Sequence, residues 1–339
     1  MISLELSGRT IGAARIESVL GAGGGGTVYK AWHTRLQKIV VIKELKHSSA
    51  NDARSRRNEV DALECIKSAY VPQALDYLTV GDQSYTMMEF IEGKSFDKLL
   101  RLKHRFAEQD TVRWYRQLAS ALKAIHSQNI CHRDIKPANI MLTPRGDVCL
   151  IDFDAALVRG KETKVISRSR GYASPEQQEI FKRFEKVYAN AMHCDGINAY
   201  TCTDAEKAFS CSGCLTEFTD RAPQSVVPES PSVSGKAIPA NSNPHNAASQ
   251  QHSIDWERSD IYSLGATMYH LLTGKRPPER AQEEFIISKK DRLVYGVAYV
   301  IEISMRVDPM ERFASADQLA EALRIIPRRG RFQSLSQRA

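Results

Sequence analysis

Apolar and polar residues alternate along the first quarter of the chain, in segments separated by glycines or polar turns. These segments are 14–20 (ARIESVL), 27–32 (TVYKAW), 38–45 (KIVVIKEL), 73–80 (QALDYLTV) and 84–93 (SYTMMEFIEG). A repeat of two residues is typical of strands that bury one face. The Gly81–Asp82 pair between the last two segments has the composition of a tight turn. The pattern therefore predicts a β-rich first quarter.

A helical repeat replaces this alternation in the rest of the chain. Residues 110–129 carry an apolar stripe, and 259–274 carry a second one that ends at Gly274, a typical helix stop. The stripes consist of Val112, Tyr115, Ala119, Leu122 and Ile125, and of Ile261, Leu264, Met268 and Leu271. Shorter amphipathic helices are predicted at 51–68 and 179–193. Their apolar faces are Val60, Leu63 and Ile66, and Ile180, Phe184, Val187 and Ala191.

A β-rich beginning followed by a helical remainder predicts an α+β fold of two lobes with a cleft between them. The expected boundaries are 1–13 for an amino-terminal segment, 14–90 for a β-rich lobe with one helix, 91–326 for a mainly helical lobe, about 179–254 for an insertion in that lobe, and 327–339 for a basic tail. Residues 222–253 of the insertion are rich in Pro, Ser, Ala and Asn and hold no aromatic residue. Such a composition buries too little surface to offset the entropy of ordering, so we expect disorder there.

Composition and charge narrow the class of protein. The 339 residues are 42% hydrophobic, which is enough for two cores, and the formal net charge is +7. Five arginines and no acid lie between 324 and 339, so a scattered solvated surface together with this basic tail explains the charge better than a specific nucleic-acid site. No run of 18 apolar residues and no secretory signal is present, so no membrane span is expected. Seven cysteines, an odd number, are typical of a reducing cytoplasm.

The glycine-rich stretch 19-VLGAGGGGTVYK-30 is a candidate phosphate-binding loop, with a flexible linker as the alternative. A Walker-type loop requires a lysine after the last glycine, and a dinucleotide fold requires the glycines to open a helix. Here the strand-like TVYKAW follows instead. The remaining pattern is G-x-G-x-x-G-x-V, a hairpin lid formed by Gly21, Gly23, Gly26 and Val28. That pattern calls for a lysine on a following strand, and 40-VVIK-43 supplies Lys43.

Two further motifs follow in order, 131-CHRDIKPANIML-142 and 150-LIDFDAA-156. With the glycine-rich loop and Lys43, they make the chain resemble the eukaryotic-type (Hanks-type) protein kinases, and within them the bacterial serine/threonine branch. The resemblance runs from about 14 to about 326, interrupted by the insertion. It implies transfer of the ATP γ-phosphate to Ser/Thr hydroxyls of protein substrates in bacterial signalling. The alternative is a pseudokinase, a nucleotide-binding scaffold without phosphate transfer.

The resemblance assigns a role to each polar residue of these motifs. Asp134 is the expected base for the substrate hydroxyl, and Lys136 is expected to stabilise the transferring phosphate. Lys43 would bridge the α- and β-phosphates, held by the carboxylate of Glu59, with Asp61 and Glu64 as fallback partners. Asn139 and Asp152 offer hard oxygen ligands that suit Mg²⁺, with Mn²⁺ as an alternative ion.

The resemblance also predicts how ATP is enclosed. Met88 would guard the back of the adenine pocket, and the backbones of Glu89 and Ile91 would bond the ring. The complete set of expected ATP contacts is Leu20, Gly21, Gly23, Gly26, Val28, Val41, Lys43, Met88, Glu89, Ile91 and Met141.

Regulation is expected in the segment from Asp152 to 174-SPE-176. Arg133 would pair with a phosphate on this segment, and Thr163 and Ser167 are the candidate autophosphorylation sites. Ser169 matches the position that contacts the base. Self-association of two copies would allow one copy to phosphorylate the other.

The resemblance further implies structural contacts outside the chemistry. Glu176 and Arg312 would form a buried ion pair, and Asp260 would brace the catalytic loop through its amides. Phe153 would stack with His132 and with Leu63.

Two departures from the family pattern stand out. Asp154 replaces the glycine of the usual D-F-G motif, which disfavours a positive φ there and adds a carboxylate beside the metal site. We interpret that carboxylate as solvated or capping, with metal binding as the alternative. The insertion contains Cys194, Cys202, Cys211 and Cys214, which are either free thiols or an irregular Zn²⁺ site.

Overall fold

The computed structural model describes residues 8–23, 26–45, 58–158, 169–182, 254–279, 285, 287 and 293–326. The described residues up to 182 and from 255 onward belong to one compact unit. The remainder of the predicted insertion and the basic tail lie outside this description.

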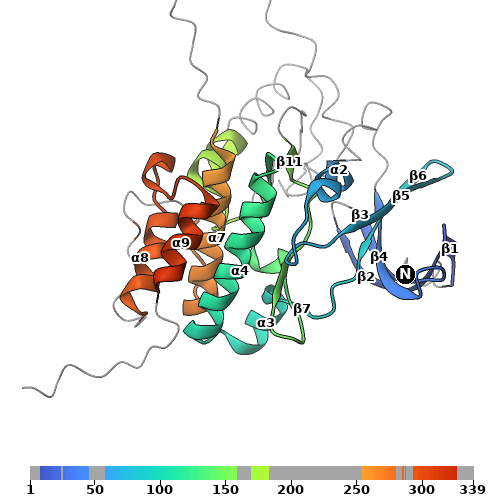
Figure 1. The fold of residues 1–339 in the computed structure, drawn as a ribbon, viewed down its shortest axis with the longest axis horizontal. Coiled ribbons are helices and arrows are strands. Elements are labelled where there is room, and N and C mark those ends of the chain that lie inside the picture. Colours follow the sequence, from blue (N-terminus) through green and yellow to red (C-terminus); the bar gives the residue numbers. More distant parts are fainter. Residues whose placement is uncertain are drawn as a thin grey trace, which may run out of the picture. The chain divides into compact units, whose positions relative to one another are not determined.

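A six-stranded antiparallel sheet forms the amino-terminal part of this unit (Figure 1). Its strands are β1 (Thr10–Ile11), β2 (Ala14–Gly23), β3 (Gly26–His33), β4 (Lys38–Leu45), β5 (Ala74–Val80) and β6 (Gln83–Glu89), in the order β1-β2-β3-β4-β6-β5. Each strand predicted from the alternation is present. The sheet begins at Thr10, inside the stretch expected to precede the fold.

The alternation in β4 explains how the sheet presents Lys43. Val40 and Ile42 point to one face, where they are buried in a small core with Ile16 and Met87. Lys43 is one residue further along, so its side chain emerges on the opposite face, because successive side chains in a strand point to opposite sides. In the register of the sheet Lys43 lies between Val28 of β3 and Thr86 of β6.

One short helix, α2 (Asn58–Cys65), faces the side of the sheet that carries Lys43. Its buried residues include Val60 and Leu63, the predicted apolar face, and Ile66 is buried directly after the helix. The helix ends three residues earlier than predicted. The hydroxyl of Ser68 accepts the N–H of Tyr70, a local turn that competes with helical hydrogen bonding.

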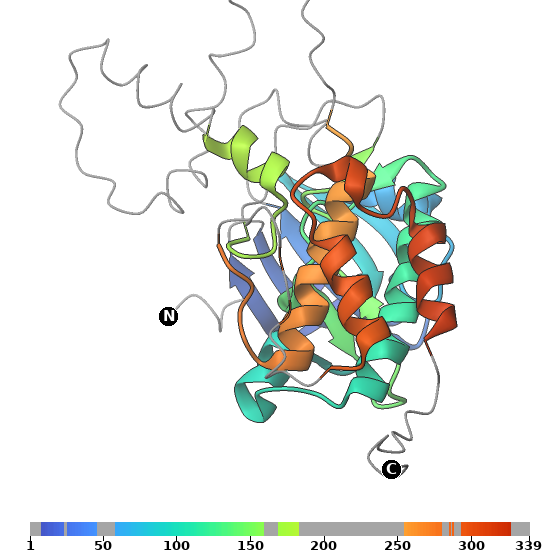
Figure 2. The ribbon, with the colours of Figure 1, turned by 90° about the vertical axis from the view of Figure 1, so that its left-hand side faces the viewer.

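Five helices make up most of the second part, and they pack around one large apolar core (Figure 2). They are α3 (Phe96–Lys103), α4 (Glu108–His126), α7 (Trp256–Thr273), α8 (Tyr295–Ser304) and α9 (Ala316–Ile325). Both predicted apolar stripes are buried in this core. Gly274 caps α7 with a φ of 72°, as expected for a left-handed helix end. Residues 175–182 are also helical, so the helix predicted at 179–193 begins earlier; its later residues lie outside the description.

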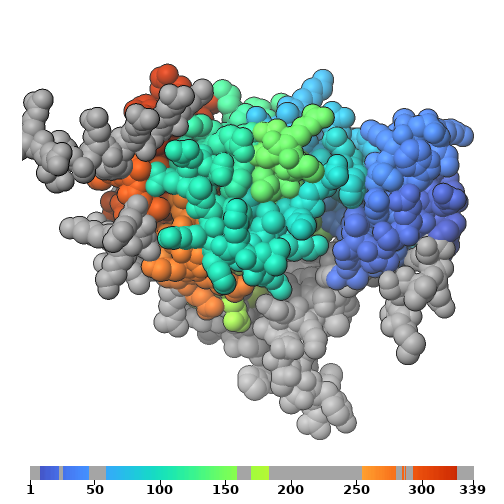
Figure 3. All heavy atoms as spheres, turned by 90° about the horizontal axis from the view of Figure 1, so that it is seen from below, coloured from blue at the N-terminus to red at the C-terminus, as the bar shows by residue number. Residues whose placement is uncertain are grey.

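Short strands and turns between α4 and α7 hold the polar motifs. They are β8 (Ile130–Cys131), η2 (Pro137–Asn139), β9 (Ile140–Leu142), β10 (Val148–Leu150) and β11 (Leu157–Val158). Strand β9 also pairs with β7 (Lys94–Ser95), which lies directly before α3. In Figure 3 the central segments, green, lie between the amino-terminal strands in blue and the carboxyl-terminal helices in orange and red. The strand pairs β9–β10 and β8–β11 flank the segments 132–139 and 151–156, which bring their side chains to the same region.

Candidate active site

Lys43 lies at the centre of a cluster of carboxylates. Its Nζ is 3.3 Å from Glu59 Oε1 and 3.1 Å from Asp152 Oδ1, and it also contacts Asp154 Oδ1. Lys43 is 6% exposed and Glu59 is 3% exposed. The ion pair expected between Lys43 and Glu59 is therefore present, whereas the fallback partners Asp61 and Glu64 are not among its contacts.

Burial and charge shift the pKa values of this cluster in opposite directions. Burial alone would lower the pKa of Lys43, but Glu59, Asp152 and Asp154 raise it well above its usual value. Burial raises the pKa of Glu59 to about 8, and the charges of the two aspartates add to this rise against the effect of Lys43. Burial would also raise the pKa of Asp152, but Lys43 outweighs it and the pKa is lowered. Lys43 is thus firmly cationic, and Asp152 is held ionised.

Asp134 lies between an ammonium group and a hydroxyl. Lys136 Nζ donates to Asp134 Oδ2 at 2.8 Å and to Ser169 Oγ at 3.0 Å, while Ser169 Oγ donates to Asp134 Oδ1 at 2.6 Å. The contact expected between Ser169 and the base is present. The carboxylate is oriented to accept a proton from a hydroxyl group, with a cation within reach of the same hydroxyl oxygen.

Asn139 is fixed by its side-chain nitrogen. Its Nδ2 donates to the carbonyl oxygen of Asp134 at 2.9 Å and to Asp134 Oδ2 at 3.1 Å. Because the nitrogen is used in this way, the side-chain carbonyl oxygen of Asn139 is the atom that can ligate a cation. Together with a carboxylate of Asp152 it provides hard oxygen ligands, so these residues fit a divalent metal such as Mg²⁺.

Asp260 on α7 braces the loop that carries Asp134. Its carboxylate accepts the backbone N–H of His132 at 2.8 Å and of Arg133 at 2.7 Å, and His126 Nε2 lies 3.0 Å from it. Arg133 has a φ of 62°, a left-handed conformation that is costly for a residue with a side chain. The two bonds to a fully buried carboxylate hold the loop in this conformation, so the expected brace is present.

His132 and Phe153 connect the two polar segments. Their ring centroids are 4.6 Å apart in an edge-to-face arrangement. His132 Nδ1 accepts the N–H of Asp134, so the ring proton is on Nε2, which lies 3.2 Å from the carbonyl oxygen of Ile151. Phe153 is fully buried in the same core as Leu63, and its N–H is 3.4 Å from Glu59 Oε1. This packing fixes the flanking Asp152 and Asp154 against α2.

The expected adenine contacts lie on β2, β3, β4, β6 and β9, and Ile91 lies two residues after β6. Val41 is paired with Met88, and Met88 is buried, as a guard of the pocket should be. The backbone N–H of Glu89 donates to the carbonyl oxygen of Gln73. The backbone group of Glu89 that could bond an adenine is therefore its carbonyl oxygen. Val28, Ile91 and Met141 are half-buried, and Leu20 is exposed. These residues lie on the sheet, directly after β6 and on β9, and their contact with ATP stays a prediction.

The glycine-rich loop forms a hairpin between β2 and β3, with Gly23 paired with Gly26. Gly26 has a φ of 133°, and a Cβ there would lie 1.9 Å from the carbonyl oxygen of Glu44. Close approach of β4 thus requires glycine at this position, independently of any phosphate. A Cβ on Gly21 would meet no atom within 4 Å, so packing does not explain the glycine there.

The structure changes the interpretation of Asp154. The residue does not have a positive φ; within the D-F-D motif the left-handed residue is Asp152, with a φ of 68°. The expected backbone penalty at Asp154 is therefore wrong. Its carboxylate is also not simply solvated or capping, because it contacts the ammonium group of Lys43. The sequence gives no signal for this contact, because Asp154 stands where the family pattern has a glycine and so has no expected partner.

Arg133 has neighbours that the sequence analysis missed. Its guanidinium lies 5.0 Å from the ring centroid of Trp256, a cation–π geometry, and its Nε donates to the carbonyl oxygen of Ala155 at 2.6 Å. Gln177 Nε2 donates to the carbonyl oxygen of Arg133. Trp256 follows directly after the insertion, where no periodic pattern could reveal its partner. The candidate phosphorylation sites Thr163 and Ser167, and Cys194, Cys202, Cys211 and Cys214, lie outside the described residues.

Comparison with known families identifies the class of protein that this fold and site define. Residues 14–212 match the family model described as "Protein kinase domain". The match covers more than half of the chain, and the chain belongs to the protein kinase family. The bilobal α+β fold expected from the sequence is confirmed, and members of the family use ATP and a divalent metal.

Several curated bacterial proteins are similar to this chain. A probable serine/threonine-protein kinase of Clostridium acetobutylicum is 34% identical over 187 residues, which are 53% of this chain and 28% of that protein. The serine/threonine-protein kinase PknA of Mycobacterium tuberculosis strain H37Rv is 27% identical over 229 residues, 63% of this chain and 51% of that protein. The matches thus span about a quarter to a half of these relatives. Among the described residues, no helix has both the length and the apolar character needed to cross a membrane.

Proposed function

We propose that the protein is a serine/threonine kinase that transfers the γ-phosphate of ATP to hydroxyl groups of protein substrates. The observation that carries this proposal is the geometry at Asp134. Its carboxylate accepts a hydrogen bond from the hydroxyl of Ser169 at 2.6 Å, and the ammonium group of Lys136 lies beside it. Phosphate transfer to an alcohol needs this combination, because the alcohol loses a proton as negative charge moves over the phosphate.

The reaction consists of one displacement. The hydroxyl oxygen of the substrate forms a bond to the γ-phosphorus, and the bond from that phosphorus to the bridging β–γ oxygen breaks. The electron pair of the broken bond remains on ADP, and the hydroxyl proton passes to Asp134. Lys136 neutralises charge on the transferred group. The backbone N–H of Arg133 donates to the carboxylate of Asp260, and this hydrogen bond keeps the neighbouring Asp134 in place during the transfer.

Lys43 and the metal ligands supply the positioning that this displacement requires. Lys43, held by Glu59, would contact the α- and β-phosphates. Asn139 and Asp152 would hold Mg²⁺, with Mn²⁺ as a substitute; the bound ion neutralises phosphate charge. Since phosphate transfer depends on alignment and charge neutralisation, the cluster around Lys43 and the cluster around Asp134 must act on one ATP.

The acceptor class and the regulation are part of the same proposal. Lys136 and the names of the bacterial relatives support serine and threonine as acceptors. Arg133 would pair with a phosphate at Thr163 or Ser167, added by a second copy of the chain, and so order the segment that carries Ser169. The hydrogen bond from Arg133 to the carbonyl oxygen of Ala155, near the start of that segment, supports this pairing.

A direct assay tests the proposal. Purified full-length protein is incubated with labelled ATP, Mg²⁺ and a generic basic acceptor protein, and the phosphorylated amino acid is identified. We expect phosphoserine or phosphothreonine, and a rate at least about 100-fold lower for Asp134→Asn, because a general base contributes about that much or more. If wild type binds ATP without transferring phosphate, the pseudokinase alternative replaces the kinase proposal.

A further inference from the structure

The ammonium group of Lys43 already has a carboxylate for each of its donors. A lysine side chain has three N–H groups, and Lys43 Nζ contacts Glu59, Asp152 and Asp154. The group is almost completely buried, so water does not supply further partners. Phosphate oxygens can therefore reach Lys43 only if one of the three carboxylates gives up its contact.

The three carboxylates differ in how firmly they are held. Glu59 is 3% exposed, lies on α2 and also lies near the N–H of Phe153. Asp152 is the expected metal ligand, so its carboxylate stays beside the phosphates when ATP binds. The side chain of Asp154 is 32% exposed, close to the 39% of Asp152, but it is not needed as a metal ligand in the proposed reaction and can turn toward solvent. Asp154 is thus the carboxylate that can leave at the lowest cost.

The charges in the cluster also indicate that Asp154 must release Lys43 when a nucleotide binds. One ammonium group faces three carboxyl groups, and the nucleotide adds several negative charges to the same volume. Like charges a few ångströms apart and shielded from water repel each other far more strongly than they do in bulk water. A carboxylate at 154 therefore opposes nucleotide binding both by repulsion and by holding the cation that the phosphates need.

We propose that Asp154 is a positioning residue that holds Lys43 while the site is free of nucleotide, and that the phosphates of ATP must displace it. This inference rests on the proposed function, because it assumes that ATP binds beside Lys43. Asp154 lowers the affinity for ATP, and the release of Lys43 couples nucleotide binding to a movement of the D-F-D segment.

Equilibrium binding of ATP to the full-length protein, measured by calorimetry with and without Mg²⁺, tests this inference. We expect Asp154→Asn to bind ATP roughly 10-fold more tightly than wild type, because the neutral amide holds Lys43 less strongly and does not repel the phosphates; a change of about 10-fold lies within the usual range of coupling between two sites. Asp154→Glu should restore weak binding. Asp82→Asn, at the exposed turn between β5 and β6, removes one negative charge far from Lys43 and should leave the affinity unchanged. Asp154→Gly serves as a second variant if Asp154→Asn does not fold.

The Lys43→Met background separates displacement from simple repulsion. Without the ammonium group there is nothing to release, so Asp154→Asn should increase affinity much less there than in wild type. In steady-state assays the KM for ATP should fall by a larger factor than kcat changes. Unchanged or weaker ATP binding by both Asp154→Asn and Asp154→Gly overturns the inference, as does an equal gain in the Lys43→Met background. If wild type and all variants fail to bind ATP, both the proposed function and this inference are wrong.

Discussion

Lys43 and Asp134 show how neighbours give an ordinary side chain its chemistry. Lys43 is buried among carboxylates that keep it cationic, whereas Asp134 has a hydroxyl and an ammonium group as neighbours. The first arrangement suits a fixed contact to phosphate, and the second suits proton transfer. Neither role follows from residue type alone, because a lysine on a solvated surface does not hold a phosphate in place and an aspartate there does not accept a substrate proton.

Burial also decides which cysteines react. Cys149 is buried, and burial raises the pKa of its thiol to about 12, whereas Cys65 is exposed. The thiolate is the reactive form, so at pH 8 we expect a thiol reagent to modify Cys65 quickly and Cys149 very slowly. Cys65→Ser should remove one fast-reacting thiol and Cys149→Ser none. Loss of a fast-reacting thiol in Cys149→Ser would show that Cys149 is accessible.

At the scale of single residues, the sequence predicts contacts whose position in a motif is fixed, such as Lys43 with Glu59 and Ser169 with Asp134. It does not predict Asp154 with Lys43 or Arg133 with Trp256. Asp154 departs from the family motif and Trp256 follows the insertion, so neither residue has an expected partner, and both contacts depend on how separate segments pack. The periodicity of apolar residues contains no information about such tertiary contacts.

Helices α7 and α8 owe their close packing to a missing side chain. A Cβ on Gly265 of α7 would lie 2.6 Å from Ser304 Cβ on α8, a separation that real side chains do not show. We expect Gly265→Ala to destabilise the protein by about 1–3 kcal/mol, because the helices must move apart. The change in urea midpoint measures this.

Gly296 of α8 is a matched control for the same substitution. A Cβ there would lie 3.4 Å from Ile326 Cγ1, an ordinary contact. Gly296→Ala should leave stability unchanged or raise it by up to about 1 kcal/mol, because alanine is the better helix former. A similar loss of stability in both variants would contradict the packing argument.

At the scale of elements, the long strands and helices were predictable and the short ones were not. Five or more alternating residues reveal β3 and β4, but β1 has only two residues, too few for any period. The strand predicted at 84–93 ends at Glu89, whose N–H bonds to Gln73 on the neighbouring segment, after which the chain leaves the sheet. Tertiary hydrogen bonds of this kind set boundaries that local patterns cannot reveal.

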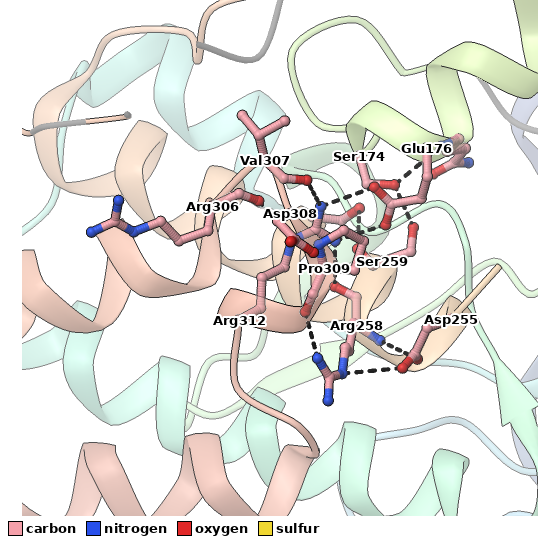
Figure 4. Close-up of polar contacts among 12 residues, drawn as sticks. Ser174, Glu176, Asp255, Arg258, Ser259, Arg306, Val307, Asp308, Pro309 and Arg312 are labelled. Atoms are coloured by element: carbon pink, nitrogen blue, oxygen red, sulfur yellow. Dashed lines mark hydrogen bonds and ion pairs between the residues drawn. The ribbon is translucent and has the colours of Figure 1, made fainter. Parts of the chain in front are cut away.

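For the molecule as a whole, Arg312 joins segments that are far apart in the sequence (Figure 4). It donates to both oxygens of Glu176, at 2.7 and 2.9 Å, and to the carbonyl oxygens of Arg258, Arg306 and Val307. Its side chain is fully buried, so the ion pair predicted from the sequence is present. The guanidinium thus connects the end of the segment 152–176 to α7 and to the chain before α9.

We expect Arg312→Met to destabilise the protein by about 3–5 kcal/mol, because it leaves Glu176 and the carbonyl groups without their buried partner. Arg312→Lys should also destabilise it, since lysine cannot form the bidentate contact. Arg101, which pairs with Asp97 on the exposed face of α3, is the control. Arg101→Ala should change stability by less than about 1 kcal/mol. Chemical unfolding measures all three, and a loss for Arg312→Met no larger than the control would contradict the prediction.

The central claim is that the cluster around Lys43 and the cluster around Asp134 act on one ATP. The most direct test measures phosphate transfer from labelled ATP to serine or threonine by wild type, Lys43→Met and Asp134→Asn under the same conditions, with circular dichroism to verify folding. We predict transfer by wild type and a loss of at least about 100-fold in each folded variant. Transfer at the wild-type rate by either folded variant, or none by wild type, would contradict the claim.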